Sequence, residues 1–357
     1  TSADGRDVLV DTNLPPPNVS LNLLEWGFST NAPALFYTKQ PPAGRRQIFR
    51  ARDSGGGFVK TQLTASVANE NFTARVSQEA TNPSVKFIFN FGNSNSFAPL
   101  WADEFTPSAT ALTLPATNAD NGCWIPGSQD LVYAGWPAGA TNSQLLRLNT
   151  SNGAVTVLTD SPADKSYVCA FLAPELAGEL LYLAVVGGTN LAVFHDAHDN
   201  TNGYFTPLIT VGIPAAMFPT TNLTQVFIHS LRALPGGRGF NGVSYFTCAL
   251  HQFADPLNPG GGAILLLGIG PSSNDVILRR LDVGPPADRR DPKLFVAGRE
   301  VFCGYSLYDG ANPVQLRITR TGIRFPDYLD ASTPFTRLQF TNSFHAGQND
   351  SFGNAMN

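Results

Sequence analysis

The chain has 357 residues, of which 43% are hydrophobic and only 14% are charged, and its formal net charge is -4. The near balance of 23 basic and 27 acidic residues leaves no broad positive surface for phosphates, so we expect no nucleic-acid partner. No run of 18 apolar residues occurs, so we expect no transmembrane helix. The 33 glycines and 27 prolines favour short strands and tight turns over helices.

The chain begins with an expected extended segment, residues 1–23, in which Asp7–Val10 can form a strand and Pro15–Pro17 fixes an extended connector. A first repeat follows, with strands predicted at 24–28, 34–38, 47–51 and 59–64. Four short strands in about 40 residues are typical of one propeller blade.

Further apolar runs separated by turn residues continue to about residue 320. They predict five more repeats, at 85–114, 123–159, 167–210, 226–281 and 294–318. The second repeat lacks a clear first strand, and the sixth lacks a clear fourth strand. Because shared terminal strands can close a ring of blades, we expect residues 7–10 or 336–340 to complete the sixth repeat. The predicted propeller domain is 24–341, and 342–357 is a predicted polar tail on the surface or in disorder.

One phrase recurs in these repeats. In the first it reads Phe28-Ser29, Leu35-Phe36-Tyr37, Ile48-Phe49, a turn from Asp53 to Gly57, and a closing Leu63-Thr64. The closing pair returns as Leu158-Thr159 and Ile209-Thr210. This pattern resembles the TolB-like six-bladed β-propellers over residues 20–320. The resemblance implies an all-β propeller of six blades, each with four antiparallel strands, that contacts protein or glycan partners through loops at one face.

Departures from the phrase in the second, fifth and sixth repeats leave the blade number between five and seven. A blade has two apolar faces, so it needs a packed neighbour on each side, which favours a ring. A β solenoid or a pair of sandwiches is the competing architecture.

Low charge and abundant Asn and Thr are typical of an exported protein, so we expect a secreted, periplasmic or cell-surface location, with a cytosolic protein as the alternative. Five Asn-x-Ser/Thr sequons are candidate glycosylation sites, at Asn18, Asn71, Asn149, Asn222 and Asn349. An Asn/Thr-rich chain also produces such sequons by chance.

The four cysteines occupy equivalent positions in two pairs of neighbouring repeats. An even count in an exported chain permits two disulfides, Cys123–Cys169 and Cys248–Cys303. Because packed sheets stand about 10 Å apart, equivalent positions can lie beyond disulfide reach. Four buried free thiols are therefore the alternative.

Candidate ligand-binding side chains lie on predicted loops. Trp136 can stack on a sugar ring or fold onto its own loop. The pairs Arg45-Arg46 and Arg289-Arg290 can bind carboxylates in bidentate fashion, or anchor loops through backbone carbonyls.

The run from His195 to Asn202 combines imidazole and oxygen ligands at His195, Asp196, His198 and Asp199. These are weak metal candidates, suited to a structural Ca²⁺ or, through the imidazoles, a softer ion, but Asp and Asn also simply form turns. We expect no other cofactor.

The fifth repeat carries His229, Arg232, Arg238 and His251. If these side chains cluster, they can supply the base and the charge-neutralising groups of an acidic-polysaccharide lyase. Asp103, Glu104 and Asp130 are nominal carboxylates for glycoside hydrolysis.

The sequence contains no Gly-x-Ser-x-Gly elbow, phosphate loop or sialidase-type box. We therefore predict a non-catalytic binding or scaffold module for protein or glycan partners. A carbohydrate-active enzyme, lyase or hydrolase, is the main alternative, and a structural subunit of a larger extracellular assembly is the third.

Overall fold

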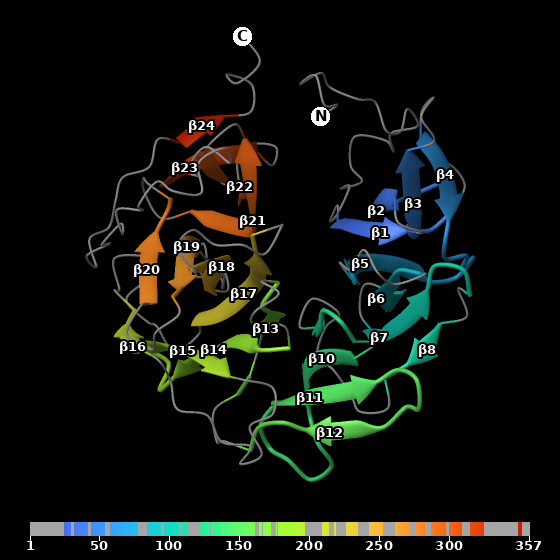
Figure 1. The fold of residues 1–357 in the computed structure, drawn as a ribbon, viewed down its shortest axis with the longest axis horizontal. Helices are drawn as coiled ribbons and strands as arrows, with labels where there is room; N and C mark the ends of the chain where they lie inside the picture. Colours follow the sequence, from blue (N-terminus) through green and yellow to red (C-terminus); the bar gives the residue numbers. More distant parts are fainter. Residues whose placement is uncertain are drawn as a thin grey trace, which may run out of the picture. The chain divides into compact units, whose positions relative to one another are not determined.

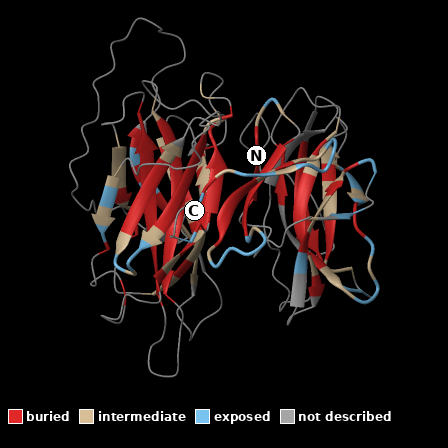
Figure 2. Ribbon diagram, turned by 90° about the horizontal axis from the view of Figure 1, so that it is seen from below, coloured by how far each residue is buried: buried red, intermediate tan, exposed pale blue. Residues whose placement is uncertain are grey.

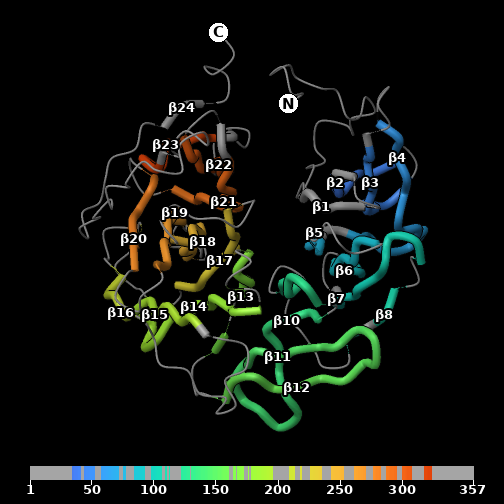
Figure 3. The backbone as a smooth tube through the Cα atoms, in the orientation of Figure 1, coloured from blue at the N-terminus to red at the C-terminus, as the bar shows by residue number. Residues whose placement is uncertain are grey.

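A computed structural model gives the protein as six four-stranded antiparallel sheets, here called blades 1 to 6 in chain order (Figures 1 and 3). Within each blade, strands that are adjacent in sequence are adjacent in the sheet. The described residues contain no helix long and apolar enough to cross a membrane. The structure describes residues 25–29, 32–41, 44–53, 58–77, 84–93, 96–106, 109–112, 122–128, 130–160, 164–165, 167–172, 176, 178–196, 209–213, 218, 226–234, 243–252, 261–270, 276–282, 287–297, 300–308, 315–324 and 349–351.

The chain divides into two compact units. Unit 1 comprises residues 1–141 and 145–157, and unit 2 comprises 142–144 and 158–357. Unit 1 holds blades 1 to 3, apart from Gln144 at the start of β11. Their strands are β1 (Glu25–Ser29), β2 (Ala32–Lys39), β3 (Gln47–Asp53), β4 (Phe58–Gln62), β5 (Glu70–Val76), β6 (Lys86–Asn93), β7 (Ser96–Asp103), β8 (Thr110–Ala111), β9 (Gly122–Trp124), β10 (Asp130–Gly135), β11 (Gln144–Asn149) and β12 (Val155–Val157).

Unit 2 holds blades 4 to 6. Their strands are β13 (Tyr167–Ala170), β14 (Leu180–Val186), β15 (Asn190–Asp196), β16 (Ile209–Gly212), β17 (Val226–Ala233), β18 (Ser244–Gln252), β19 (Gly261–Ile269), β20 (Val276–Arg280), β21 (Asp288–Ala297), β22 (Glu300–Tyr308), β23 (Gln315–Arg324) and β24 (Asn349–Ser351). The predicted class, an all-β propeller of six four-stranded blades, is confirmed by these sheets.

Two details of the strands differ from the sequence prediction. Blade 6 takes its fourth strand from β24, which pairs with β23 and lies inside the segment for which only a polar tail is predicted. All four strands of that sheet therefore come from the C-terminal part of the chain, and not from both ends. Residues 7–10 and 336–340, the two predicted closing strands, lie outside the described residues. Blade 2 has a first strand, β5, that the sequence prediction missed.

Alternating side chains bury both faces of a blade, as a period of two requires. In blade 2, Phe87 and Phe89 pack in a cluster with blade 1, whereas Ile88 between them packs with Trp124 and Tyr133 of blade 3. Figure 2 shows buried residues along the strands of the blades. A blade therefore contributes to the core on both of its sides.

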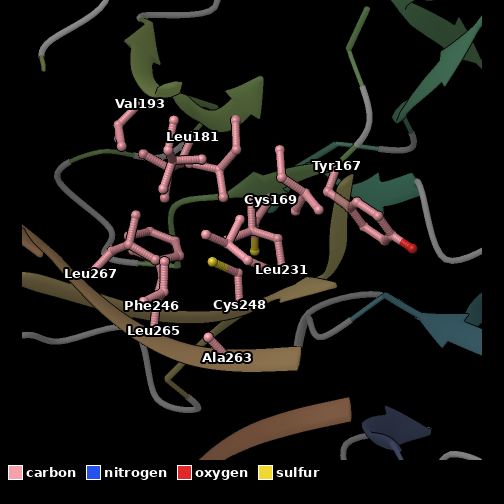
Figure 4. Packing of buried hydrophobic residues seen from close by; sticks show 14 of the residues in the cluster. Tyr167, Cys169, Leu181, Val193, Leu231, Phe246, Cys248, Ala263, Leu265 and Leu267 are labelled. Atoms are coloured by element: carbon pink, nitrogen blue, oxygen red, sulfur yellow. The ribbon is translucent and has the colours of Figure 1, made fainter. Parts of the chain in front are cut away.

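Blades 4 and 5 share a large cluster of this kind in unit 2. Figure 4 shows Leu181 and Val193 of blade 4 facing Phe246 and Leu265 of blade 5. The other face of blade 5 packs against blade 6 through Tyr245, Ala249 and their neighbours. Blade 5 is thus covered on both faces.

The recurring closing pair has a structural role at the end of blade 1. The Leu63 N–H donates to the Ile48 carbonyl at 2.8 Å, and the Ile48 N–H donates to the Thr64 hydroxyl at 2.9 Å. The same hydroxyl donates to Gln47 Oε1, and Thr159 donates to Gln144 Oε1 in the same way in blade 3. These bonds extend the pairing of the third strand beyond the end of the fourth, which explains the Gln and Thr of the repeat.

Candidate functional site

The first strands of blades 5 and 6, β17 and β21, lie side by side in unit 2 and each carries a β-bulge (Figure 1). The bulge in β17 falls between His229 and Leu231, and the bulge in β21 falls between Arg290 and Lys293. Within the bulges Ser230 and Asp291 have positive φ angles, 63° and 54°. Such backbone is costly for a non-glycine residue, and bulges re-aim the side chains beside them. Both the β-bulges and the positive φ angles therefore occur together on β17 and β21.

We call the polar side chains around these bulges the paired-bulge site. The site comprises His229 and Arg232 on β17, His251 on β18, and Asp288, Arg290 and Asp291 on β21. Three of its members, His229, Arg232 and His251, belong to the cluster that the sequence suggests. The fourth residue of that suggestion, Arg238, lies outside the described residues.

Asp288 is the anchor of the paired-bulge site. His251 Nε2 lies 2.6 Å from Asp288 Oδ1, and Arg290 forks onto the same carboxylate with Nε at 3.0 Å from both oxygens and Nη2 at 2.6 Å from Oδ2. Burial alone would raise the pKa of Asp288, but the hydrogen bonds from His251 and Arg290 lower it to about 2. Asp288 is therefore ionised at neutral pH and holds both partners in place.

His229 lies beside this network. Its ring centroid is 6.0 Å from that of His251 and 6.4 Å from that of Tyr167, and its Nδ1 is 3.9 Å from Asp291 Oδ1. Burial lowers the pKa of His229 below its usual value of 6.5, the nearby Asp291 charge opposes this shift, and His251 and Arg290 reinforce it. The imidazole of His229 is therefore neutral at pH 7.

Arg232 supplies a second guanidinium from β17. Burial lowers its pKa to about 9, and the Asp291 charge partly offsets this effect. Arg232 therefore keeps its charge at pH 7. Among its guanidinium and carboxyl groups, the site therefore has two arginines, Arg232 and Arg290, and two aspartates, Asp288 and Asp291.

A close backbone contact joins the start of β19 to the start of β21. The Gly262 N–H donates to the Ala287 carbonyl at 2.8 Å, and Arg289 Nη1 reaches the carbonyls of Gly262 and Ala287 at 3.4 and 3.3 Å. The Arg289 side chain is buried and also lies 3.5 Å from Asp282. Arg289 thus contacts backbone carbonyls of two neighbouring segments, as in the second of the two roles considered for the arginine pairs.

The other predicted ligand-binding residues lie in unit 1. Arg46 forms an ion pair with Glu70 of blade 2, so it too joins two segments of the chain. Arg45 is exposed. Trp136 lies in the loop between β10 and β11 and is 36% exposed. Nothing in the structure assigns a ligand to Arg45 or Trp136.

The nominal carboxylates for glycoside hydrolysis have structural partners. Glu104 is buried, pairs with Arg50 at 2.5 Å and accepts the Val85 N–H at 2.9 Å. Asp130 accepts from Arg147 Nε at 2.6 Å, and Asp103 accepts the Phe105 N–H at 2.9 Å.

The weak metal candidate is only partly described. His195 Nε2 pairs with Glu179, and its ring lies 4.5 Å from that of Phe171. The side chain of Asp196, together with His198 and Asp199, lies outside the described residues. Among the residues that the structure does describe, no group of three or more His, Cys, Asp or Glu side chains is arranged to hold a metal ion.

All four cysteines are free and buried, so the predicted disulfides are not formed and the alternative of buried thiols holds. Cys248 and Cys169 belong to the cluster between blades 4 and 5 (Figure 4). Cys303 belongs to the cluster on the other face of blade 5, where its sulfur lies 3.8 Å from the Thr247 hydroxyl. Because neighbouring residues of a strand face opposite sides, Thr247 meets Cys303 and Cys248 points away from it.

One of the predicted sequons is incompatible with glycosylation of the folded chain. Asn71 is 2% exposed, and its side-chain nitrogen donates to Gln47 Oε1 at 2.8 Å. Asn149 is half-buried and accepts the Ser151 N–H at 2.9 Å, as in an Asx turn. Asn18, Asn222 and the side chain of Asn349 lie outside the described residues.

Sequence reasoning missed Asp288 and Asp291, which complete the paired-bulge site. Both flank the Arg289-Arg290 pair in the inter-blade segment, so the Asp-Arg-Arg-Asp order was a usable signal. The bulges could not be predicted from the sequence. An extra residue only interrupts the alternation of apolar and polar residues, and this alternation is already irregular in both strands.

No protein-family model and no curated protein matches the sequence. Among solved structures, TolB from Acinetobacter baumannii is 13% identical with a TM-score of 0.44, covering 76% of this chain and 56% of that chain. The chain is structurally similar to TolB-like propellers. Trypanosoma rangeli sialidase is 11% identical with a TM-score of 0.47, covering 85% of this chain and 55% of that chain. An oligogalacturonate lyase in complex with manganese is 11% identical with a TM-score of 0.46, covering 82% and 72%.

The chain spans little more than half the length of TolB and of the sialidase. Structural similarity of this kind shows the fold, and it does not show what this chain binds or cleaves.

Proposed function

We propose that this chain is a non-catalytic glycan-binding propeller of an exported protein, and that the paired-bulge site holds the glycan. One observation carries the proposal: the side chains of Arg290 and Asp291 are 40% and 39% exposed, and Arg290 belongs to the hydrogen-bonded network around Asp288. His251, in that network, is only 5% exposed and is held by Asp288. Polar groups that are ordered before binding lose little entropy when a ligand hydrogen-bonds to them.

The surface around the site favours a glycan over a protein partner. Protein interfaces have an apolar centre. Among the described residues with large exposed hydrophobic side chains, only Val186 belongs to unit 2, and the others, Val59, Val67, Phe105, Trp136 and Val157, belong to unit 1. Charged and imidazole groups in this setting are suited to hydroxyl-rich ligands.

The arrangement of the arginines favours binding over lyase chemistry. A lyase that acts beside a carboxylate must neutralise that carboxylate in the transition state. Here Arg290 forks onto Asp288, Arg289 binds backbone carbonyls, and Arg232 lies beside Asp291. His229 is neutral and can accept a proton, so cleavage of the glycan has to be measured as well as binding.

The test is a glycan array followed by calorimetry with the best glycan. The variants are Asp291→Asn and, as a matched control, Asp160→Asn at an exposed position of the same unit. Asn tolerates positive φ as well as Asp does, so Asp291→Asn should keep the bulge. We expect Asp291→Asn to weaken binding about tenfold or more, while Asp160→Asn leaves it unchanged.

Mass spectrometry of the glycan after incubation with the protein completes the test. We expect the glycan to be recovered unchanged. Glycan binding that Asp291→Asn leaves intact, no binding across the array, or cleavage of the glycan would each overturn the proposal. Export is tested separately, by asking whether the native protein is recovered outside the cytoplasm of its source.

A further inference from the structure

We infer that the ligand of the paired-bulge site is a neutral glycan, bound through hydroxyl groups that donate hydrogen bonds to Asp291 and His229, and that the site disfavours uronates. This inference rests on the proposed function.

His229 can face a ligand with only one of its nitrogens. Its Nδ1 is buried, has no hydrogen-bond partner among the described residues, and lies 3.9 Å from Asp291 Oδ1. We place the ring proton on Nδ1, because the adjacent carboxylate favours a positive N–H dipole at that nitrogen. The His229 side chain is 24% exposed although its Nδ1 is buried, and with the proton on Nδ1 its Nε2 carries a lone pair. The exposed side of His229 is therefore an acceptor.

Asp291 offers a second acceptor next to the first. Its side chain is 39% exposed, and its contact with His229 at 3.9 Å is longer than a hydrogen bond. A carboxylate has about four lone-pair directions and no donor. Two acceptors side by side require a ligand that donates, and a sugar hydroxyl does so without bringing a charge.

The charge balance of the site argues against a charged ligand. The two arginines are offset by the two aspartates, and Arg290, the more exposed arginine, is already paired with Asp288. A uronate carboxylate would lie next to Asp291 and Nε2, where like charge and lone pairs repel it. An ammonium group could donate to Asp291, but it would lie beside the positive charge of Arg232, which already offsets that carboxylate. A neutral polyol meets neither penalty.

The experiment compares three classes of hexasaccharide by calorimetry at pH 7, at low and high salt. The neutral class contains hexamers of glucose, mannose, xylose and N-acetylglucosamine. The acidic class contains hexamers of galacturonate and guluronate, and the basic class contains hexamers of glucosamine. We expect a neutral hexamer to bind at least about tenfold more tightly than any acidic or basic one, and salt to leave its affinity unchanged.

Asp291→Asn provides the second arm, because it replaces an acceptor oxygen with an amide donor and removes one negative charge. We expect this substitution to weaken the binding of the neutral hexamer and to strengthen the binding of the acidic hexamers. The ratio of the two affinities should therefore fall or invert. Asp160→Asn makes the same change of charge at an exposed position and should leave the preference as it is.

The outcomes separate the two proposals. If no hexamer binds, the proposed function fails and this inference fails with it. If an acidic or a basic hexamer binds most tightly and Asp291→Asn alters its affinity, glycan binding at the site stands and the inference about a neutral ligand is overturned. If Asp291→Asn leaves the affinity for the best neutral hexamer unchanged, the ligand binds elsewhere on the protein. The proposed site and the inference about a neutral ligand are then both overturned.

Discussion

The Cα of Gly262 lies so close to Arg289 that a Cβ added to it would be 2.4 Å from the Arg289 carbonyl oxygen and 2.8 Å from its amide nitrogen. Both contacts are to backbone, which cannot move aside as a side chain can. The contact holds the start of β19 against the start of β21, at the residue between Asp288 and Arg290.

Gly262→Ala should therefore destabilise the protein and disturb the paired-bulge site. We expect a loss of about 1–3 kcal/mol in the free energy of unfolding, measured with urea, because the two backbones must separate. Gly212→Ala is the matched control, since its Cβ would have its nearest neighbour, Asn190 Oδ1, at 3.9 Å. Equal stability of the two variants would contradict the close contact.

The Asp288 network should give the stability a dependence on acid pH. The folded-state pKa of about 2 lies below the usual value of 3.8, so the stabilisation is present above pH 3.8 and is lost as the pH falls towards 2. The difference corresponds to about 2 kcal/mol. Asp288→Asn should be less stable than the wild type by about that amount at pH 7, and the two should converge near pH 2.

Urea unfolding at a series of pH values measures this difference, with Asp160→Asn as the control for a lost surface charge. A gap between wild type and Asp288→Asn that is the same at pH 7 and at pH 2 would show that the network does not depend on the carboxylate charge.

The four cysteines should behave as buried thiols. Burial raises the pKa of Cys303 to about 12 and raises that of Cys248 as well, so neither forms a reactive thiolate at pH 7. A thiol reagent should therefore label the native protein slowly and label all four cysteines after unfolding without reductant. A peptide that joins Cys248 to Cys303 in a non-reducing digest would contradict this prediction.

The blades could be predicted from sequence where alternation and turns are regular. In blade 3 the predicted strands at 130–134 and 144–148 agree within one residue with β10 and β11. In blade 2 the strand β5 was missed, because a bulge between Phe72 and Arg75 breaks its alternation. The fourth strand of blade 6 was missed because Asn349–Ser351 has no apolar pattern, and its pairing with β23 supplies the only signal.

The candidate site was predicted in part. His229 and His251 stood out as rare residue types in one repeat, and the chain has only five histidines. Their connection to Asp288 and Asp291 depends on contacts between two blades, which sequence spacing does not reveal. The different partners of the two neighbouring arginines could also not be predicted from the sequence. Arg289 binds backbone carbonyls, while Arg290 binds Asp288 in the site.

The most direct test of the account is the ionisation and tautomer of His229 with and without ligand. Nitrogen NMR of the imidazole side chains reports both, and the His229 signals are assigned by their loss in His229→Gln. At pH 7 we predict a neutral ring protonated on Nδ1, and a shift of the Nε2 resonance when the tightest neutral hexasaccharide is added. A ring protonated on Nε2, or an Nε2 resonance that does not move at saturation, would contradict the account.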